Sequence, residues 1–311
     1  MNHQPSSLRV GQAFAHSGSD LADARAADVH ERFAELDGRL IRYRDSGGQG
    51  PAVLLTHGIG ESLEFWHRQM ETLGDSLRLI AWDMPGHGLS DEVPEAMDLE
   101  GQARVAWRLL DRLGVQRVHL VGNSLGAAVS LRMAAQATEK VATLLLANGA
   151  TLGPEVMGAF RAMSLPGLGE LMNRPGASAV AQQIKAIVHH PASVTPEVRA
   201  AIERNVHRPG GTQHFLALLR RLTTWRGQRP EPCLHTRHIL KGLRVPVLFV
   251  HGENDSVLPV AQSRRAHAQT RGSYLVTLSA CGHTPQLEQV EVFNSMMVDL
   301  CTQGHVLKHT A

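Results

Sequence analysis

Short apolar segments alternate with amphipathic segments along most of the chain. The apolar runs, bounded by Gly, Pro or polar clusters, have the length and composition of strands buried inside a sheet. The segments between them repeat apolar residues at helical spacing. Strands that alternate with helices in this way predict parallel βαβ units. The predicted buried strands are 52–56, 77–82, 118–121, 141–147, 245–250 and 273–278.

The segment before these strands has a different pattern. Residues 29–36 alternate weakly, meet the turn dipeptide Asp37-Gly38, and continue into residues 39–44. Asp-Gly between two such runs is typical of a tight hairpin, so we predict an antiparallel hairpin at the edge of the sheet. Helices are predicted over 63–73, 98–113, 127–135, 259–266 and 287–300.

The alternation stops after Ala150. Residues 151–241 contain no convincing strand, and apolar residues at helical spacing are interrupted often by Pro and Gly. This pattern predicts a helical insertion that covers the rest of the domain as a cap. The predicted organisation is a flexible tail over 1–28 with a short helix at 20–27, a core formed by 29–150 and 242–311, and a cap over 151–241.

Composition, charge and motifs indicate which partners and cofactors are not expected. The chain has 311 residues, of which 43% are hydrophobic, and a net charge of +2 with neutral His. No basic stripe or acidic tail is present, so nucleic acid is not an expected partner. The 18 His are scattered without a metal-ligand spacing, and neither a dinucleotide fingerprint nor a P-loop occurs. We therefore predict no metal and no cofactor.

Cysteine usage and hydropathy indicate the compartment. Cys233, Cys281 and Cys301 form no C-x-x-C pair, and their odd number argues against a disulfide framework. No apolar run approaches 18 residues, and the N-terminus lacks the pattern of a signal peptide. We expect a cytoplasmic protein with no membrane partner. The oligomeric state stays open, with a homodimer as one possibility.

The segment Gly122–Gly126, which reads Gly-Asn-Ser-Leu-Gly, lies between a predicted strand and a predicted helix. G-x-S-x-G at such a turn is typical of a nucleophile elbow, which exposes a serine hydroxyl at the C-terminal edge of a sheet. The two glycines stand where a Cβ would collide with the tight strand–helix crossing. Ser124 is our predicted nucleophile, and the alternative is an ordinary serine at a helix start.

A serine nucleophile needs a base, and the base needs an orienting acid. In this arrangement the chain order is Ser, then Asp or Glu, then His. Asp255 follows the strand 245–250, and His283 follows the strand 273–278. We predict Asp255 as the acid and His283 as the base. Glu253 is a competing acid, whereas Asn148, at the end of strand 141–147, provides no carboxylate.

Two backbone N–H groups must stabilise the developing oxyanion. Leu125, directly after the serine, is the first predicted donor. Ile59, in the loop after strand 52–56, is the second, because Gly58 permits the backbone path that it needs. We expect His57 to brace this loop and Asp83 and His87 to shape a neighbouring turn.

The chain resembles enzymes of the α/β-hydrolase fold over residues 29–303. This resemblance implies an α/β protein with a mostly parallel eight-stranded sheet, helices on both faces, and a helical cap inserted after strand six. It implies no cofactor and a small-molecule acyl substrate. The residues that carry it are His57-Gly58, Asp83–Ser90, Gly122–Gly126, Gly252–Asp255 and Gly282-His283.

Within that fold, the chain resembles the branch of serine esterases and meta-cleavage-product (C–C) hydrolases. In the C–C hydrolases the elbow asparagine, here Asn123, helps to hold the substrate. Two departures concern the segment Ile59–Ser62, which is not Gly-Pro-rich, and Thr284, where those enzymes often carry Trp. They also use a cap arginine, for which Arg161 and Arg174 are available.

We expect the cap to contribute Met157, Phe160, Met163 and Trp225 to the substrate pocket. The leading hypothesis is a serine hydrolase that cleaves a small or medium carboxylic ester through an acyl-enzyme. The alternatives are a C–C hydrolase, an acyltransferase with the same three residues, and a ligand receptor without catalysis.

Overall fold

The computed structural model describes residues 31–305, so the predicted tail over 1–28 and its short helix lie outside the described residues. Eight strands form one sheet in the order β1-β2-β4-β3-β5-β6-β9-β10. The pairs β1–β2 and β2–β4 are antiparallel, and all others are parallel. The strands are β1 (Glu31–Leu36), β2 (Arg39–Asp45), β3 (Ala52–Thr56), β4 (Arg78–Trp82), β5 (Val118–Asn123), β6 (Val141–Ala147), β9 (Val247–Gly252) and β10 (Tyr274–Leu278).

The edge hairpin forms where the turn dipeptide predicted it. Asp37 and Gly38 both have positive φ, 50° and 75°, as a tight hairpin turn requires. The inner parallel strands β3, β5, β6 and β9 are buried on both faces, which explains their continuous apolar runs, whereas the edge strand β10 is partly exposed. The α/β architecture with a mostly parallel eight-stranded sheet is therefore confirmed.

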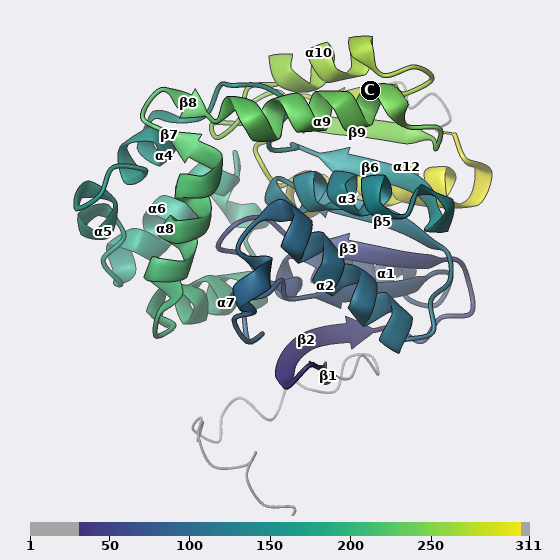
Figure 1. Cartoon of the computed structure of the whole chain (residues 1–311), viewed down its shortest axis with the longest axis horizontal. Helices are drawn as coiled ribbons and strands as arrows, with labels where there is room; N and C mark the ends of the chain where they lie inside the picture. The colour runs from purple at the N-terminus through teal and green to yellow at the C-terminus, as the bar shows by residue number, and fades with distance from the viewer. Residues whose placement is uncertain (1–30, 306–311) are drawn as a thin grey trace, which may run out of the picture.

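Helices cover both faces of the sheet (Figure 1). The cluster on one face includes buried residues of α2, α3, α9 and α10, and the cluster on the other includes residues of α1 and α12. Asp98 caps the start of α2 by accepting the N–H of Gly101 at 2.7 Å. The helices outside the segment 151–229 are α1 (His67–Leu73), α2 (Leu99–Arg112), α3 (Leu125–Gln136), α9 (Pro230–Gly242), α10 (Ala261–Gln269), α11 (Pro285–Glu288) and α12 (Val290–Gln303). Short 3-10 turns lie at Leu63–Trp66, Pro94–Ala96, Thr138–Lys140 and Pro191–Ser193.

The segment predicted as a cap over 151–241 divides into two parts. Helices α4 to α8 gather beside the sheet, at the left of Figure 1, whereas α9 packs against α3 and α10. A short hairpin that the apolar pattern did not reveal joins the two parts. The elements are α4 (Gly158–Met163), α5 (Leu168–Met172), α6 (Ala177–Ile187), α7 (Pro196–His207), α8 (Gly211–Leu222), β7 (Thr223–Thr224) and β8 (Gly227–Gln228).

Buried ion pairs fix α7 to the sheet. Arg204 of α7 donates to both carboxylate oxygens of Glu64, at 2.9 and 3.1 Å. Arg42 of β2 donates to the same carboxylate at 2.8 Å and to Asp83 at 3.1 Å. Removing one partner of such a network leaves an uncompensated buried charge. The network therefore ties α7 to β2 through the 3-10 turn Leu63–Trp66.

Candidate active site

Ser124 stands at a strained turn between β5 and α3. Its φ is 53° and its ψ is −113°, a conformation that L-residues rarely adopt and that occurs at functional turns. A Cβ on Gly122 would lie 2.3 Å from the carbonyl oxygen of Gly126, and one on Gly126 would lie 2.1 Å from that of Thr56. Both glycines are therefore required by close backbone contacts, as the sequence motif predicted.

The loops after β9 and β10 bring Asp255 and His283 into contact. Their hydrogen bond, from His283 Nδ1 to Asp255 Oδ2, measures 2.8 Å. Asp255 is also held by its other oxygen, which accepts the N–H groups of Val257 at 2.7 Å and Leu258 at 3.0 Å. Since Nδ1 faces the carboxylate, Nε2 is the nitrogen left for Ser124. Ser124 and His283 line the same cavity.

A second imidazole supports the carboxylate. Nε2 of His251 lies 3.2 Å from Asp255 Oδ2, and its Nδ1 lies 2.7 Å from Ser263 Oγ. Burial opposes the ionisation of Asp255, but the charge of His283 and the hydrogen bonds from His251 and His283 outweigh it. The pKa of Asp255 is therefore held below its ordinary value. The acid is an anion at neutral pH.

The same interactions shift the base in the opposite direction. Burial lowers the pKa of His283, whereas the charge of Asp255 and its hydrogen bond raise it, with a further contribution from Glu61. The net result is a pKa above the ordinary value of 6.5. An imidazole with a raised pKa is a stronger base for a serine hydroxyl.

Two asparagines have roles that sequence reasoning missed. Asn148 donates to Asp255 Oδ2 at 2.7 Å and to the Gly282 carbonyl at 3.1 Å. Asn123 donates to the His283 carbonyl at 2.9 Å and is completely buried. Its amide thus holds the loop that carries His283, and Asn123 is not among the cavity-lining residues. The sequence signal for Asn148 was its position directly after β6, at the end of a parallel strand where the acid of such a site could also lie.

The loop after β3 has a fixed conformation. His57 Nδ1 lies 2.7 Å from the Gly58 carbonyl, and its Nε2 accepts the N–H of Met84 at 3.1 Å. Burial lowers the pKa of His57, which agrees with a neutral ring that donates through one nitrogen and accepts through the other. Glu61 accepts the N–H of Gly58 at 2.7 Å. Ile59 itself lines the cavity.

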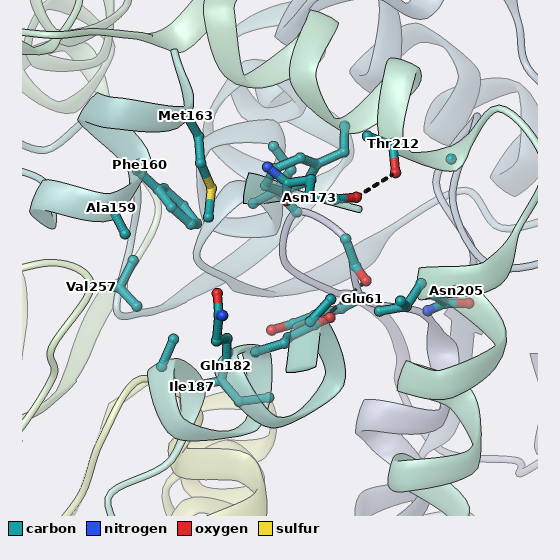
Figure 2. Close-up of a pocket in the computed structure, with 18 of the residues that line it drawn as sticks. Glu61, Ala159, Phe160, Met163, Asn173, Gln182, Ile187, Asn205, Thr212 and Val257 are labelled. Atoms are coloured by element: carbon teal, nitrogen blue, oxygen red, sulfur yellow. Dashed lines mark hydrogen bonds between the residues drawn. The ribbon is translucent and has the colours of Figure 1, made fainter. Parts of the chain in front are cut away.

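The cavity above Ser124 has a volume of about 420 Å³, and most of its lining surface is apolar although polar side chains also contribute to it. Met157, Phe160 and Met163 line it, as the sequence predicted. Figure 2 shows Phe160 and Met163 across the cavity from Gln182 and Ile187. Trp225 does not line it: the side chain is 55% exposed, and the Arg226 guanidinium stacks on it at 4.9 Å. Its position in the short β7–β8 turn directs it outward.

Helix α6 connects this cavity to the loops that carry His283 and Ile59. The Ile187 carbonyl accepts the N–H of His283 and the hydroxyl of Thr284, each at 3.0 Å. Gln183 donates to the Gly60 carbonyl at 3.3 Å. Helix α6 therefore contacts the loops of the predicted base and the predicted oxyanion donor in addition to lining the cavity.

Other candidate chemistry lies outside the cavity. Within residues 31–305, one group has ligand atoms close enough for a metal ion, namely His67, Glu71 and Glu197. Glu197 is already paired with Arg44 at 2.9 Å. Cys233, Cys281 and Cys301 are free thiols. No helix in the described part of the chain is long and apolar enough to cross a membrane.

An eight-stranded sheet with a strained serine turn near its centre and helices on both faces defines the class of α/β-hydrolase folds. A family model described as alpha/beta hydrolase fold matches residues 51–290. The chain belongs to this family.

Relatives within the family have several activities. The chain is 32% identical, over 91% of its length and 71% of the relative, to the dihydrolipoyllysine-residue acetyltransferase component of an acetoin cleaving system from Pseudomonas putida. It is 26% identical, over 90% of its length and 97% of the relative, to a 2-hydroxy-6-oxononadienedioate/2-hydroxy-6-oxononatrienedioate hydrolase from a Pseudomonas species. The structure resembles the carboxylesterase CesB from Bacillus subtilis with a TM-score of 0.74 and 21% identity, covering 90% of this chain and 93% of that one.

Proposed function

We propose that the protein is a serine hydrolase that cleaves carboxylic esters of small or medium size. The observation that carries this proposal is the placement of Ser124 at a strained elbow in the same cavity as His283, which is held by ionised Asp255. This arrangement supplies a nucleophile, a base and an orienting acid.

The reaction begins when Ser124 Oγ attacks the ester carbonyl and its proton passes to His283 Nε2. The imidazolium is stabilised by Asp255, and the tetrahedral oxyanion accepts hydrogen bonds from the N–H groups of Leu125 and Ile59. Gly58 is not used because its N–H is donated to Glu61. His283 then protonates the leaving alcohol and activates a water that releases the acid.

The cavity supports a substrate with an apolar body. Its walls carry Met157, Phe160, Met163, Met172 and Phe215, and methionine-rich walls adapt to substrates of different shape. A volume of about 420 Å³ is in the range of small-molecule sites.

A C–C hydrolase is the second candidate, because a relative with that activity aligns over nearly its whole length. The residues that the sequence offered for binding the substrate of a C–C hydrolase, two cap arginines and the elbow asparagine, do not line the cavity here. Neither Arg161 nor Arg174 is among the described lining residues, and Arg161 Nε donates to the Trp225 carbonyl at 2.8 Å. The Asn123 amide already donates a hydrogen bond to the His283 carbonyl.

A panel of substrates separates these activities. We expect turnover of p-nitrophenyl acetate and butyrate, with little cleavage of a meta-cleavage-product dienoate. Added alcohol or thiol tests acyl transfer, since an acyltransferase would give the exchanged ester as the main product. Absence of turnover with all esters would contradict the proposal and favour a receptor.

The pH profile of ester hydrolysis should show the raised pKa of His283. The base must be neutral to accept the serine proton, so kcat/KM should fall as pH decreases through that pKa. The decline should be centred above pH 6.5, the ordinary value for imidazole. Stopped-time assays of a neutral ester between about pH 5 and 9 provide the measurement. A decline centred below pH 6.5 would contradict the described geometry.

A further inference from the structure

Glu61 is the only carboxyl group among the described residues that line the cavity. It lies on the loop after β3, close to the predicted oxyanion donor, and the mechanism above does not use it as a reacting group. Figure 2 shows it facing the cavity between Gln182 of α6 and Asn205 of α7. The side chain is almost completely buried, with 2% of the residue exposed.

The surroundings of Glu61 differ from those of the other buried carboxylate nearby. Glu64 is held by two guanidinium groups, those of Arg42 and Arg204. The Glu61 carboxylate has one hydrogen bond among the described residues, from the N–H of Gly58 to Oε2 at 2.7 Å, and no ion pair with a described residue. A buried carboxyl group without a cation keeps capacity to accept a hydrogen bond from a ligand.

The electrostatics near Ser124 follow from the groups that face this cavity. Burial raises the pKa of Glu61 to about 7, with His283 and the Gly58 N–H opposing the shift. Above that pH the carboxylate is charged and poorly solvated. The negative charge of Glu61 stabilises protonated His283 and so contributes to the raised pKa of that base.

The other ionisable groups that line the cavity are less able to offset this charge. Burial lowers the pKa of both His87 and His214, so both rings are neutral. The Arg208 guanidinium donates to the carbonyls of Gly88 and Ser90, at 2.9 and 2.7 Å, and its positive charge interacts with the carboxylates of Glu92, Asp83 and Asp91. Lys185 is an exposed residue on α6. Among these lining groups, Glu61 is the one whose charge acts on His283, so it influences the end of the cavity that contains Ser124.

We propose that Glu61 sets the charge selectivity of the site, favouring substrates that carry a cationic or hydrogen-bond-donating group and disfavouring those that carry a carboxylate. This inference rests on the proposed esterase function and identifies its substrate class. Charges a few ångströms apart in a medium of low dielectric interact strongly enough to alter specificity. Such a site rejects an anionic substrate by repulsion as well as by the cost of desolvation.

Aryl acetates of matched shape test the proposal. The pairs are 3-carboxyphenyl against 3-carbamoylphenyl acetate, and 3-(trimethylammonio)phenyl against 3-tert-butylphenyl acetate. At about pH 8.5 the wild type should prefer the carbamoyl over the carboxy ester by at least about 10-fold in kcat/KM, and the cationic ester over its neutral match. Glu61→Gln keeps an oxygen for the Gly58 N–H, so it should fold, and it should reduce both preferences to within about 2-fold.

The control is Glu253→Gln, which removes an exposed carboxylate that follows β9 and pairs with Arg264, and which should keep both preferences. Glu61→Gln with unchanged charge preferences would contradict the inference. If no ester is hydrolysed, the proposed function fails, and the charge preference is then read from calorimetric Kd values of 3-carboxyphenol and 3-carbamoylphenol. Equal Kd values for these two phenols in the wild type would overturn the inference independently.

Discussion

Ser124→Ala should reduce kcat/KM for p-nitrophenyl butyrate by about 10⁴-fold or more, because loss of the nucleophile in a serine hydrolase leaves only binding and oxyanion stabilisation. The substitution removes one oxygen from a position with φ of 53°. Alanine tolerates that strained backbone about as well as serine does, so the fold should remain. Initial rates at matched protein concentration, with thermal unfolding as the control, provide the measurement. Residual activity within about 10-fold of the wild type would exclude Ser124 as the nucleophile.

Asp255→Asn should also be strongly damaging, with an expected loss of about 10³- to 10⁴-fold in kcat/KM. Oδ2 of Asp255 receives hydrogen bonds from both Asn148 and His283, at 2.7 and 2.8 Å, with His251 at 3.2 Å. An amide NH₂ in that place faces donors instead of accepting from them. His283 then loses the partner that fixes its tautomer and stabilises its charged form.

Glu253→Gln is the matched comparison for this prediction, because Glu253 is the alternative acid in the same turn. Its carboxylate is exposed, accepts the Thr277 hydroxyl at 3.0 Å and pairs with Arg264 at 3.3 Å. We expect kcat/KM within about 2-fold of the wild type, since exposed ion pairs contribute little. A larger loss for Glu253→Gln than for Asp255→Asn would reverse the assignment of the acid.

The elements that the sequence predicted are those with strong local signals. Ser124 lies in a turn that only glycines at positions 122 and 126 allow, and the chain order of Asp255 and His283 followed from the strands before them. Met157, Phe160 and Met163 were predicted from their place on an apolar helix, and all three line the cavity.

The direction of individual side chains was not predictable in the same way. Asn123 directly precedes Ser124 in the sequence, yet its amide donates to the carbonyl of His283, 160 residues away. Trp225 was assigned to the cavity because it is aromatic and lies in the cap, but a short hairpin with no apolar alternation turns it to solvent. These outcomes depend on long-range packing, which hydrophobic periodicity does not encode.

The position of the Glu61 carboxylate was not predicted from the sequence of its loop. The segment Ile59–Ser62 was distinguished from the C–C hydrolases by its composition, with no role for its charge. In the structure the Gly58 N–H draws this carboxylate inward beside the cavity. A charged residue inside a glycine-containing loop at the end of a buried strand was the available signal.

Covalent labelling tests the central claim most directly, because it reports which residue attacks. The protein should react with a fluorophosphonate to give one adduct by intact mass, and peptide mapping should place that adduct on Ser124. The Ser124→Ala variant should remain unlabelled under the same conditions. An adduct on another residue, or undiminished ester hydrolysis by Ser124→Ala, would contradict the account.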